Sequence, residues 1–265
     1  MQFIKIIKSK ANSIFKSILI LSLIILVKVS SWWNVKCNNL VLENISISNT
    51  KIIESEEFHN LVNGFIGNSL EDISIDSISK IIERHPYVEA ARVSKWYPTK
   101  IKIELIERQP IAILNISPMI LLDKYGFVIP NENSKKSFNL PILNNFNSNL
   151  DLYPYGHKAL SENVVHCIEW LNRIKTEYRS LYEDISEMKM TSGNDINIIL
   201  TEYPTHIFLG KNHIWTKIEI LKKFETELLP KKLSDFSYLD MRYDNHVMAT
   251  NRTLGQLCQI RTTNR

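Results

Sequence analysis

The sequence predicts an α+β protein with a single N-terminal transmembrane helix, a compact β-α-α-β-β module, and a β-sheet domain with two flanking helices. Three observations predict this architecture. An apolar run at residues 18–27 follows a lysine-rich start. A helical pattern stops at His85-Pro86 and gives way to strict alternation over residues 100–107. Beyond residue 110, two amphipathic helical patterns separate short apolar runs.

The N-terminus has the pattern of a targeting segment. Four lysines precede the apolar run: Lys5, Lys8, Lys10 and Lys16. The lysine-rich side is expected to stay in the cytoplasm, as a tail at residues 1–13, and Trp32-Trp33 suits the far membrane interface. A spanning helix needs about 20 residues, so the predicted signal anchor covers residues 14–33. A cleaved signal peptide is the alternative, although the residues after Lys28 lack a small-x-small cleavage site.

Composition excludes several function classes. The net charge is only +4, from 32 basic and 28 acidic residues, so no nucleic-acid partner is expected. Glycine occurs 7 times, and no glycine spacing forms a phosphate-binding loop. The three cysteines, Cys37, Cys167 and Cys258, form no C-x-x-C pair, and at least one is unpaired within the chain.

The first part of the exported region predicts one strand and two helices. Residues 40–48 alternate as a strand, and residues 55–65 and 75–84 carry apolar side chains at helical spacing. Ser74 suits the N-cap of the second helix. Pro86 closes that helix, because proline disfavours helical backbone at the residue before it.

A β-hairpin follows the second helix. Val88 opens an extended run, and Tyr97-Pro98-Thr99 makes the turn. The second strand, residues 100–107, is expected to bury one face, made of Ile101, Ile103 and Leu105. Two interpretations of Trp96-Tyr97 remain open: an exposed docking pair, or a cover of the hairpin over its helices.

The region after Pro110 alternates short strands with two helices. Asp123 to Gly126 forms a turn within a β-meander, and a flexible tail is expected at residues 251–265. The helices are expected at residues 160–175 and 213–229. The strands are expected at residues 111–114, 120–122, 127–129, 140–143, 185–189, 195–200, 205–209 and 236–242, the last continuing weakly through residues 247–249.

No residue constellation in the sequence predicts an enzyme, a metal site or a cofactor site. The histidines have no metal-ligand spacing. His166 and Cys167 are adjacent on a predicted helix, where neighbours point in different directions. The last strand pattern, around residues 236–242, indicates binding of a partner rather than catalysis, because a partner can extend a strand that lies at the edge of a sheet. An inner strand, or a strand covered by a loop, is the competing interpretation.

Several motifs together resemble those of the FtsQ/DivIB family of bacterial cell division proteins. The POTRA module of that family is matched by the sequences His85-Pro86-Tyr87-Val88 and Trp96-Tyr97-Pro98, and its signature by Glu107-Arg108-Gln109-Pro110-Ile111-Ala112. Asp123-Lys124-Tyr125-Gly126 and Leu140-Pro141 resemble motifs of its second domain, and Tyr238 to Tyr243 resembles its terminal strand.

The resemblance implies a domain organisation. Residues 38–110 would form the POTRA module, with Pro86, Val88, Pro98, Glu107, Arg108 and Pro110 as its signature. Residues 111–250 would form the FtsQ-type β domain.

The resemblance also implies a function. The protein would be a non-enzymatic divisome scaffold, a single-pass type II protein of the inner membrane with its bulk in the periplasm and enriched at the septum. Its partners would be FtsB and FtsL, added as strands at the C-terminal edge, and the septal peptidoglycan synthases FtsW and FtsI. The partner-binding residues carried over are Arg242, Tyr243, Asp244, Asn245, His246 and Val247.

Two other functions compete with this one. A POTRA-containing envelope assembly or secretion factor would usually carry tandem modules and a C-terminal barrel, and the sequence predicts one module. An exported enzyme would need a polar constellation in residues 144–203, where the sequence shows no recognisable motif.

Overall fold

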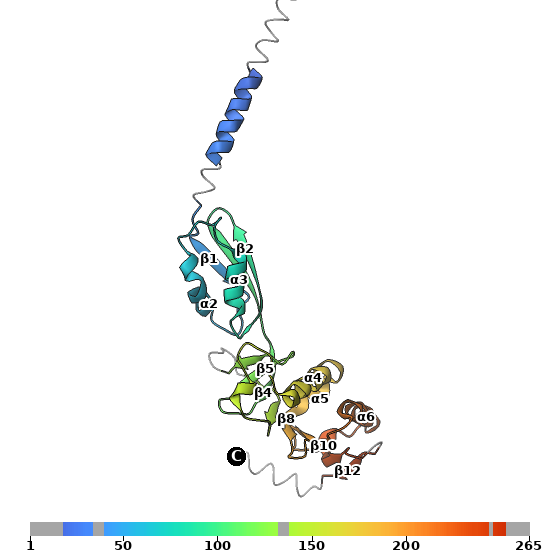
Figure 1. Cartoon of the computed structure of the whole chain (residues 1–265). Helices are drawn as coiled ribbons and strands as arrows, with labels where there is room; N and C mark the ends of the chain where they lie inside the picture. The colour runs from blue at the N-terminus through green and yellow to red at the C-terminus, as the bar shows by residue number, and fades with distance from the viewer. Residues whose placement is uncertain (1–17, 34–39, 132–137, 244–245, 253–265) are drawn as a thin grey trace, which may run out of the picture. The chain divides into compact units, whose positions relative to one another are not determined.

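The computed structural model describes residues 18–33, 40–131, 138–243 and 246–252 (Figure 1). The predicted cytoplasmic tail, most of the predicted C-terminal tail, Cys37 and Cys258 lie outside these residues. The chain divides into two compact units. The first contains most of the β-α-α-β-β module, and the second contains everything from Ile106 onward together with Lys51–Glu54 and Glu83–Ala90.

The N-terminal apolar segment is helical over residues 18–33, and all of its side chains are exposed. The first four residues of the predicted anchor, 14–17, lie outside the described part of the chain. Within the described residues, no helix combines the length and apolar character of a membrane-crossing segment.

The β-α-α-β-β module has the predicted order. Its strands form a three-stranded sheet with the order β1-β3-β2, in which β1 runs parallel to β3. The elements are β1 (Asn44–Ser48), α2 (Ser55–Val62), a 3-10 turn (Asn63–Phe65), α3 (Ile75–Glu83), β2 (Val88–Trp96) and β3 (Lys100–Glu107).

Alternation along β3 places its apolar face in the core, as predicted, because successive strand residues face opposite sides of a sheet. Ile101, Ile103 and Leu105 are all buried. They share this core with one face of each helix: Phe58 and Val62 from α2, and Ile78 and Ile82 from α3.

The interpretation of Trp96-Tyr97 as a cover over the helices is wrong. Trp96 is 57% exposed and Tyr97 is 59% exposed. The pair therefore projects from the tip of the β2–β3 hairpin into solvent.

The β domain is built on one nine-stranded sheet with the order β12-β11-β10-β9-β8-β7-β4-β5-β6. Its strands are β4 (Pro110–Leu114), β5 (Ile120–Asp123), β6 (Val128–Pro130), β7 (Ile142–Asn144), β8 (Ile185–Met190), β9 (Ile196–Leu200), β10 (His206–Gly210), β11 (Phe236–Asp240) and β12 (Met248–Asn251). Its α-helices are α4 (Glu162–Glu177), α5 (Arg179–Asp184) and α6 (Ile214–Glu227).

Strands β4, β5 and β6 pair antiparallel in chain order, which confirms the predicted meander. The two predicted helices are α4 and α6, and each buries one apolar stripe in the core of this domain. The sequence analysis missed α5, a helix of 6 residues that ends directly at β8.

The predicted last strand is not the edge of the sheet. β11 pairs parallel with β10 on one side and antiparallel with β12 on the other. Residues 236–240 are therefore an inner strand, and the edge is β12. A local pattern of alternation reports which face of a strand is buried but not how many neighbours the strand has.

Candidate functional site

The signature residue Glu107 is buried and bound to main-chain donors. Its carboxylate accepts hydrogen bonds from the backbone N–H groups of Lys51, Ile52 and Ile53, at 2.7 to 3.2 Å. Only 6% of Glu107 is exposed. Burying a carboxylate without hydrogen-bond partners costs free energy, and the three converging N–H groups offset this cost. The role of Glu107 is therefore to fix the segment after β1 against the end of β3.

Arg108 and Asp123 form a buried ion pair. The Arg108 Nη1 atom lies 2.8 Å from the Asp123 Oδ2 atom, and the guanidinium lies 3.8 Å from the centre of the Phe127 ring. The other oxygen of Asp123 accepts from the backbone N–H groups of Tyr125 and Phe127, at 2.9 and 2.8 Å. The predicted turn at residues 123–126 is thus held by Asp123, which also neutralises Arg108.

The remaining signature residues have packing and turn roles. Pro86 follows the end of α3, Val88 is buried at the start of β2, and Pro98 is exposed in the hairpin turn. Pro110 is buried at the start of β4, opposite Asp123. Pro110, with Glu107 and Arg108, therefore marks where the module ends and the β domain begins, whereas Pro86, Val88 and Pro98 belong to the hairpin of β2 and β3 and its approach.

Cys167 and His166, the cysteine and histidine considered for catalysis, lie in surroundings that do not form a catalytic or metal site within the described part of the chain. Cys167 is fully buried in the core of the β domain, and this burial raises the pKa of its thiol. His166 is exposed and lies near the Trp170 ring. Among the residues described by the structure, no group of histidine, cysteine and acidic side chains is arranged to hold a metal ion.

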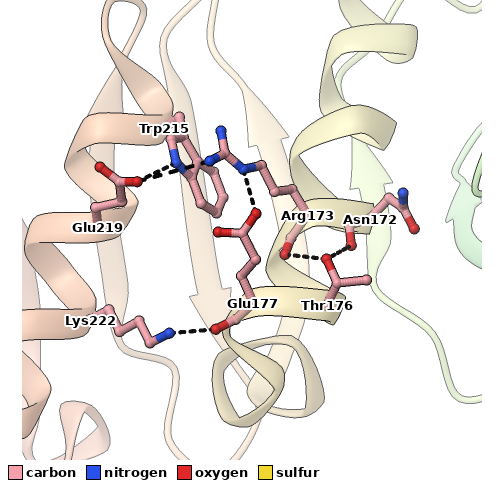
Figure 2. A network of polar contacts seen from close by, with 7 residues as sticks. All are labelled: Asn172, Arg173, Thr176, Glu177, Trp215, Glu219 and Lys222. Atoms are coloured by element: carbon pink, nitrogen blue, oxygen red, sulfur yellow. Dashed lines mark hydrogen bonds and ion pairs between the residues drawn. The ribbon is translucent and has the colours of Figure 1, made fainter.

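A polar network joins α4 to α6 (Figure 2). Arg173 stacks 3.7 Å from the Trp215 ring centre and pairs with Glu177 at 2.7 Å. Trp215 donates to Glu219 at 2.7 Å, and Lys222 donates to the Glu177 carbonyl. Arg173 and Lys222 therefore connect the two helices beside a groove of about 450 Å³, which Glu177, Glu219 and Lys222 help to line.

The C-terminal edge of the sheet is strand β12, the most exposed strand of the β domain. All four residues of β12 are exposed, and within the described residues no strand pairs with its outer side. The Arg252 N–H donates to the Asp235 carbonyl at 3.0 Å. Because N–H directions alternate along a strand, the N–H groups of Ala249 and Asn251 then face away from β11.

The predicted partner-binding residues lie between β11 and β12 rather than on the edge strand. Of these six residues, Asp244 and Asn245 lie outside the described part of the chain. Tyr243 is 56% exposed and, with His246, helps to line a cavity of about 270 Å³ against α6. Val247 immediately precedes β12. The region predicted from sequence thus adjoins the edge strand. The sequence indicated part of that strand, as a weak continuation of the preceding one through residues 247–249, but not a separate strand.

Arg242 is held by Asp240 at the end of β11. Its Nη2 atom lies 2.6 Å from the Asp240 Oδ2 atom, and its Nε atom contacts both carboxylate oxygens. The hydrogen bonds from Arg242 lower the pKa of the Asp240 carboxyl from its ordinary value. Half of the Arg242 side chain is exposed, so solvent screens the pair.

Replacing Arg242 with methionine is expected to change stability in a pH-dependent way. A lowered pKa in the folded state stabilises the protein above the ordinary carboxyl pKa, and this contribution is lost as pH falls through the lowered pKa. Arg242→Met should therefore be less stable than wild type near pH 7, and the difference should shrink below about pH 4.

Urea unfolding of the full chain across this pH range measures the effect. Arg179→Met is the matched control, because Arg179 forms an exposed pair with Glu183 on α5. A difference between Arg242→Met and wild type that stays constant with pH would contradict the role given to Asp240.

Both parts of the chain match models of known protein families. A model described as "POTRA domain, FtsQ-type" matches residues 40–108, and one described as "Cell division protein FtsQ/DivIB, C-terminal" matches residues 112–242. The "Cell division protein FtsQ" of Geotalea daltonii is 22% identical over 208 residues, which are 78% of this chain and 74% of the relative. The protein of the same name from Syntrophotalea carbinolica is 22% identical over 207 residues, 78% of this chain and 72% of the relative.

Proposed function

The chain belongs to the FtsQ/DivIB family of bacterial cell division proteins, and we propose that it acts in the divisome as a non-enzymatic scaffold. In this proposal it recruits and links division proteins during septum formation through exposed surfaces. The polar signature residues Glu107 and Arg108 support such a role, because both are engaged in buried structural contacts, Arg108 with Asp123.

The outer side of β12 is the observation that carries the proposal. A partner segment in extended conformation can add to such an edge through main-chain hydrogen bonds, and side-chain pockets beside the edge then supply specificity. The cavity lined by Tyr243 and His246 lies against α6, and both of these residues precede β12 in the chain. We assign FtsB to this edge by strand addition, together with FtsL.

The proposal places the bulk of the chain in the periplasm. The apolar helix at residues 18–33, extended by residues 14–17, would act as an uncleaved single-pass type II anchor in the inner membrane. Lysines on its N-terminal side would keep a tail at residues 1–13 in the cytoplasm.

The two periplasmic parts have separate tasks in this proposal. The module, residues 38–110, would serve recruitment to the septum. The β domain, residues 111–250, would connect FtsB and FtsL with the peptidoglycan synthases FtsW and FtsI. The alternative of an envelope assembly or secretion factor gains no support, because the matching C-terminal model is that of a cell division protein.

Depletion of the protein is expected to produce filamentous cells, and a fluorescent fusion to its N-terminus is expected at midcell. The reason is that loss of a scaffold blocks septation without stopping growth. Cells carrying an intact second copy of the gene are the control. Normal septation on depletion, with the fusion spread over the whole envelope, would contradict the proposal.

A further inference from the structure

The tip of the β2–β3 hairpin, residues 95–100, carries an unusually exposed aromatic pair. Trp96 and Tyr97 are 57% and 59% exposed, and Pro98 beside them is also exposed. Large aromatic side chains cost free energy in water, so adjacent exposed ones indicate a contact surface. The contacts of Glu107, of Arg108 and of β12 do not involve this tip.

The hairpin tip lies at the end of the module where the chain arrives from the apolar helix. The backbone N–H of Glu43 donates to the Thr99 carbonyl at 2.9 Å, and Asn44 is in register with Lys100. A chain can span at most about 3.6 Å per residue. The stretch from Trp33 to Asn44 therefore keeps the tip within roughly 40 Å of the end of the helix.

The side chains around the aromatic pair favour a phospholipid surface. Lys100 is exposed. The Lys102 ammonium lies 5.4 Å from the centre of the Trp96 ring, but its charge is paired with the Glu104 carboxylate at 2.6 Å. Lys95, the neighbour of Trp96, donates to the Glu71 carbonyl at 3.0 Å. Tryptophan and tyrosine prefer the headgroup region of a bilayer, and lysines beside them attract anionic lipids. The exposed Glu43 opposes this attraction at the same end of the module.

We propose that the hairpin tip docks into the headgroup region of the membrane in which the N-terminal helix is anchored, with Trp96 and Tyr97 inserted and Lys100 facing anionic phosphates. The inference rests on the proposed membrane anchor. Docking gives the module a second attachment point beside the helix and so fixes its orientation at the membrane surface.

The five tryptophans of the chain allow a direct test. The full chain is labelled with 5-fluorotryptophan and reconstituted in nanodiscs of phosphatidylethanolamine and phosphatidylglycerol that contain a paramagnetic headgroup lipid. The Trp96 resonance is assigned by its absence in Trp96→Phe. Trp32 and Trp33 report on the anchor, and the half-buried Trp170 and Trp215 of the β domain serve as internal references.

We expect the paramagnetic relaxation of Trp96 to exceed that of Trp170 and Trp215 by at least about threefold, and to approach that of Trp32 and Trp33. Tyr97→Ser keeps the probe and should lower the Trp96 enhancement about twofold, whereas Tyr125→Ser, which removes an exposed tyrosine of the β domain, should leave it unchanged. Replacing phosphatidylglycerol with phosphatidylcholine should also lower it.

Two results would overturn the inference, and they differ in what else they overturn. Strong relaxation of Trp32 and Trp33 with a reference-level value at Trp96 would remove the docking and leave the anchor intact, and the aromatic pair would then be assigned to a protein partner. Reference-level relaxation at Trp32 and Trp33 as well would contradict the anchor itself.

Discussion

Replacing Ala249 with proline is expected to weaken FtsB binding at least tenfold, about 1.4 kcal/mol, while leaving the nine-stranded sheet folded. Ala249 is in register with Leu239, and its N–H group faces away from β11. Proline removes that outward donor and is tolerated on an edge strand when its nitrogen faces solvent. A lost hydrogen bond costs roughly 1 kcal/mol, and the proline ring adds a steric obstacle to the incoming strand.

Ala249→Ser is the matched control, because it changes the same exposed side chain and retains the backbone N–H. The affinity of the full chain for FtsB, measured with both proteins in nanodiscs, should be close to wild type for this variant. Thermal unfolding should be the same for all three proteins to within a few degrees. Wild-type affinity of Ala249→Pro would rule out strand addition at β12.

Replacing Asp123 with alanine is expected to destabilise the β domain by about 3 to 5 kcal/mol. The substitution leaves the charge of Arg108 buried without its partner, and Arg108 is only 8% exposed. It also removes the acceptor for the N–H groups of Tyr125 and Phe127, which hold the turn before β6. Denaturant unfolding of the full chain, followed by tryptophan fluorescence, measures the loss.

Two further variants separate the causes. Arg108→Met in the Asp123→Ala background should recover part of the lost free energy, because it removes the unpaired buried charge and keeps an apolar contact with Phe127. Asp151→Ala, at an exposed position, should change stability by less than about 0.5 kcal/mol. Equal stability of Asp123→Ala and Asp151→Ala would show that the buried pair is not needed.

The module was predictable because its local signals agree with its tertiary structure. Ile101, Ile103 and Leu105 alternate in sequence and are buried in β3, and the apolar stripe of α3 faces the same core. Pro86 ends the second helix at the expected point. The signature at Glu107 was visible as a motif, but its role was not, because its donors Lys51, Ile52 and Ile53 lie more than fifty residues earlier.

The C-terminal edge could be located only approximately. Met248–Asn251 carries neither alternation nor β-branched apolar residues facing a core, because all four side chains are exposed. The amphipathic pattern of Phe236–Asp240 is stronger, and it identified a buried strand but not the strand beside it. The parallel pairing of β10 with β11, across the helix α6, is likewise set by tertiary packing rather than by local sequence.

Amide hydrogen exchange of the full chain with and without FtsB tests the proposed interface most directly. Outward N–H groups on an unpaired edge exchange quickly, and an added strand should slow them by about tenfold or more. Strand addition predicts that this protection appears at Ala249 and Asn251. In Ala249→Pro, which has no amide hydrogen at position 249, the protection of Asn251 is expected to be lost. Saturating FtsB that leaves the exchange of β12 unchanged, and protects another surface instead, would contradict it.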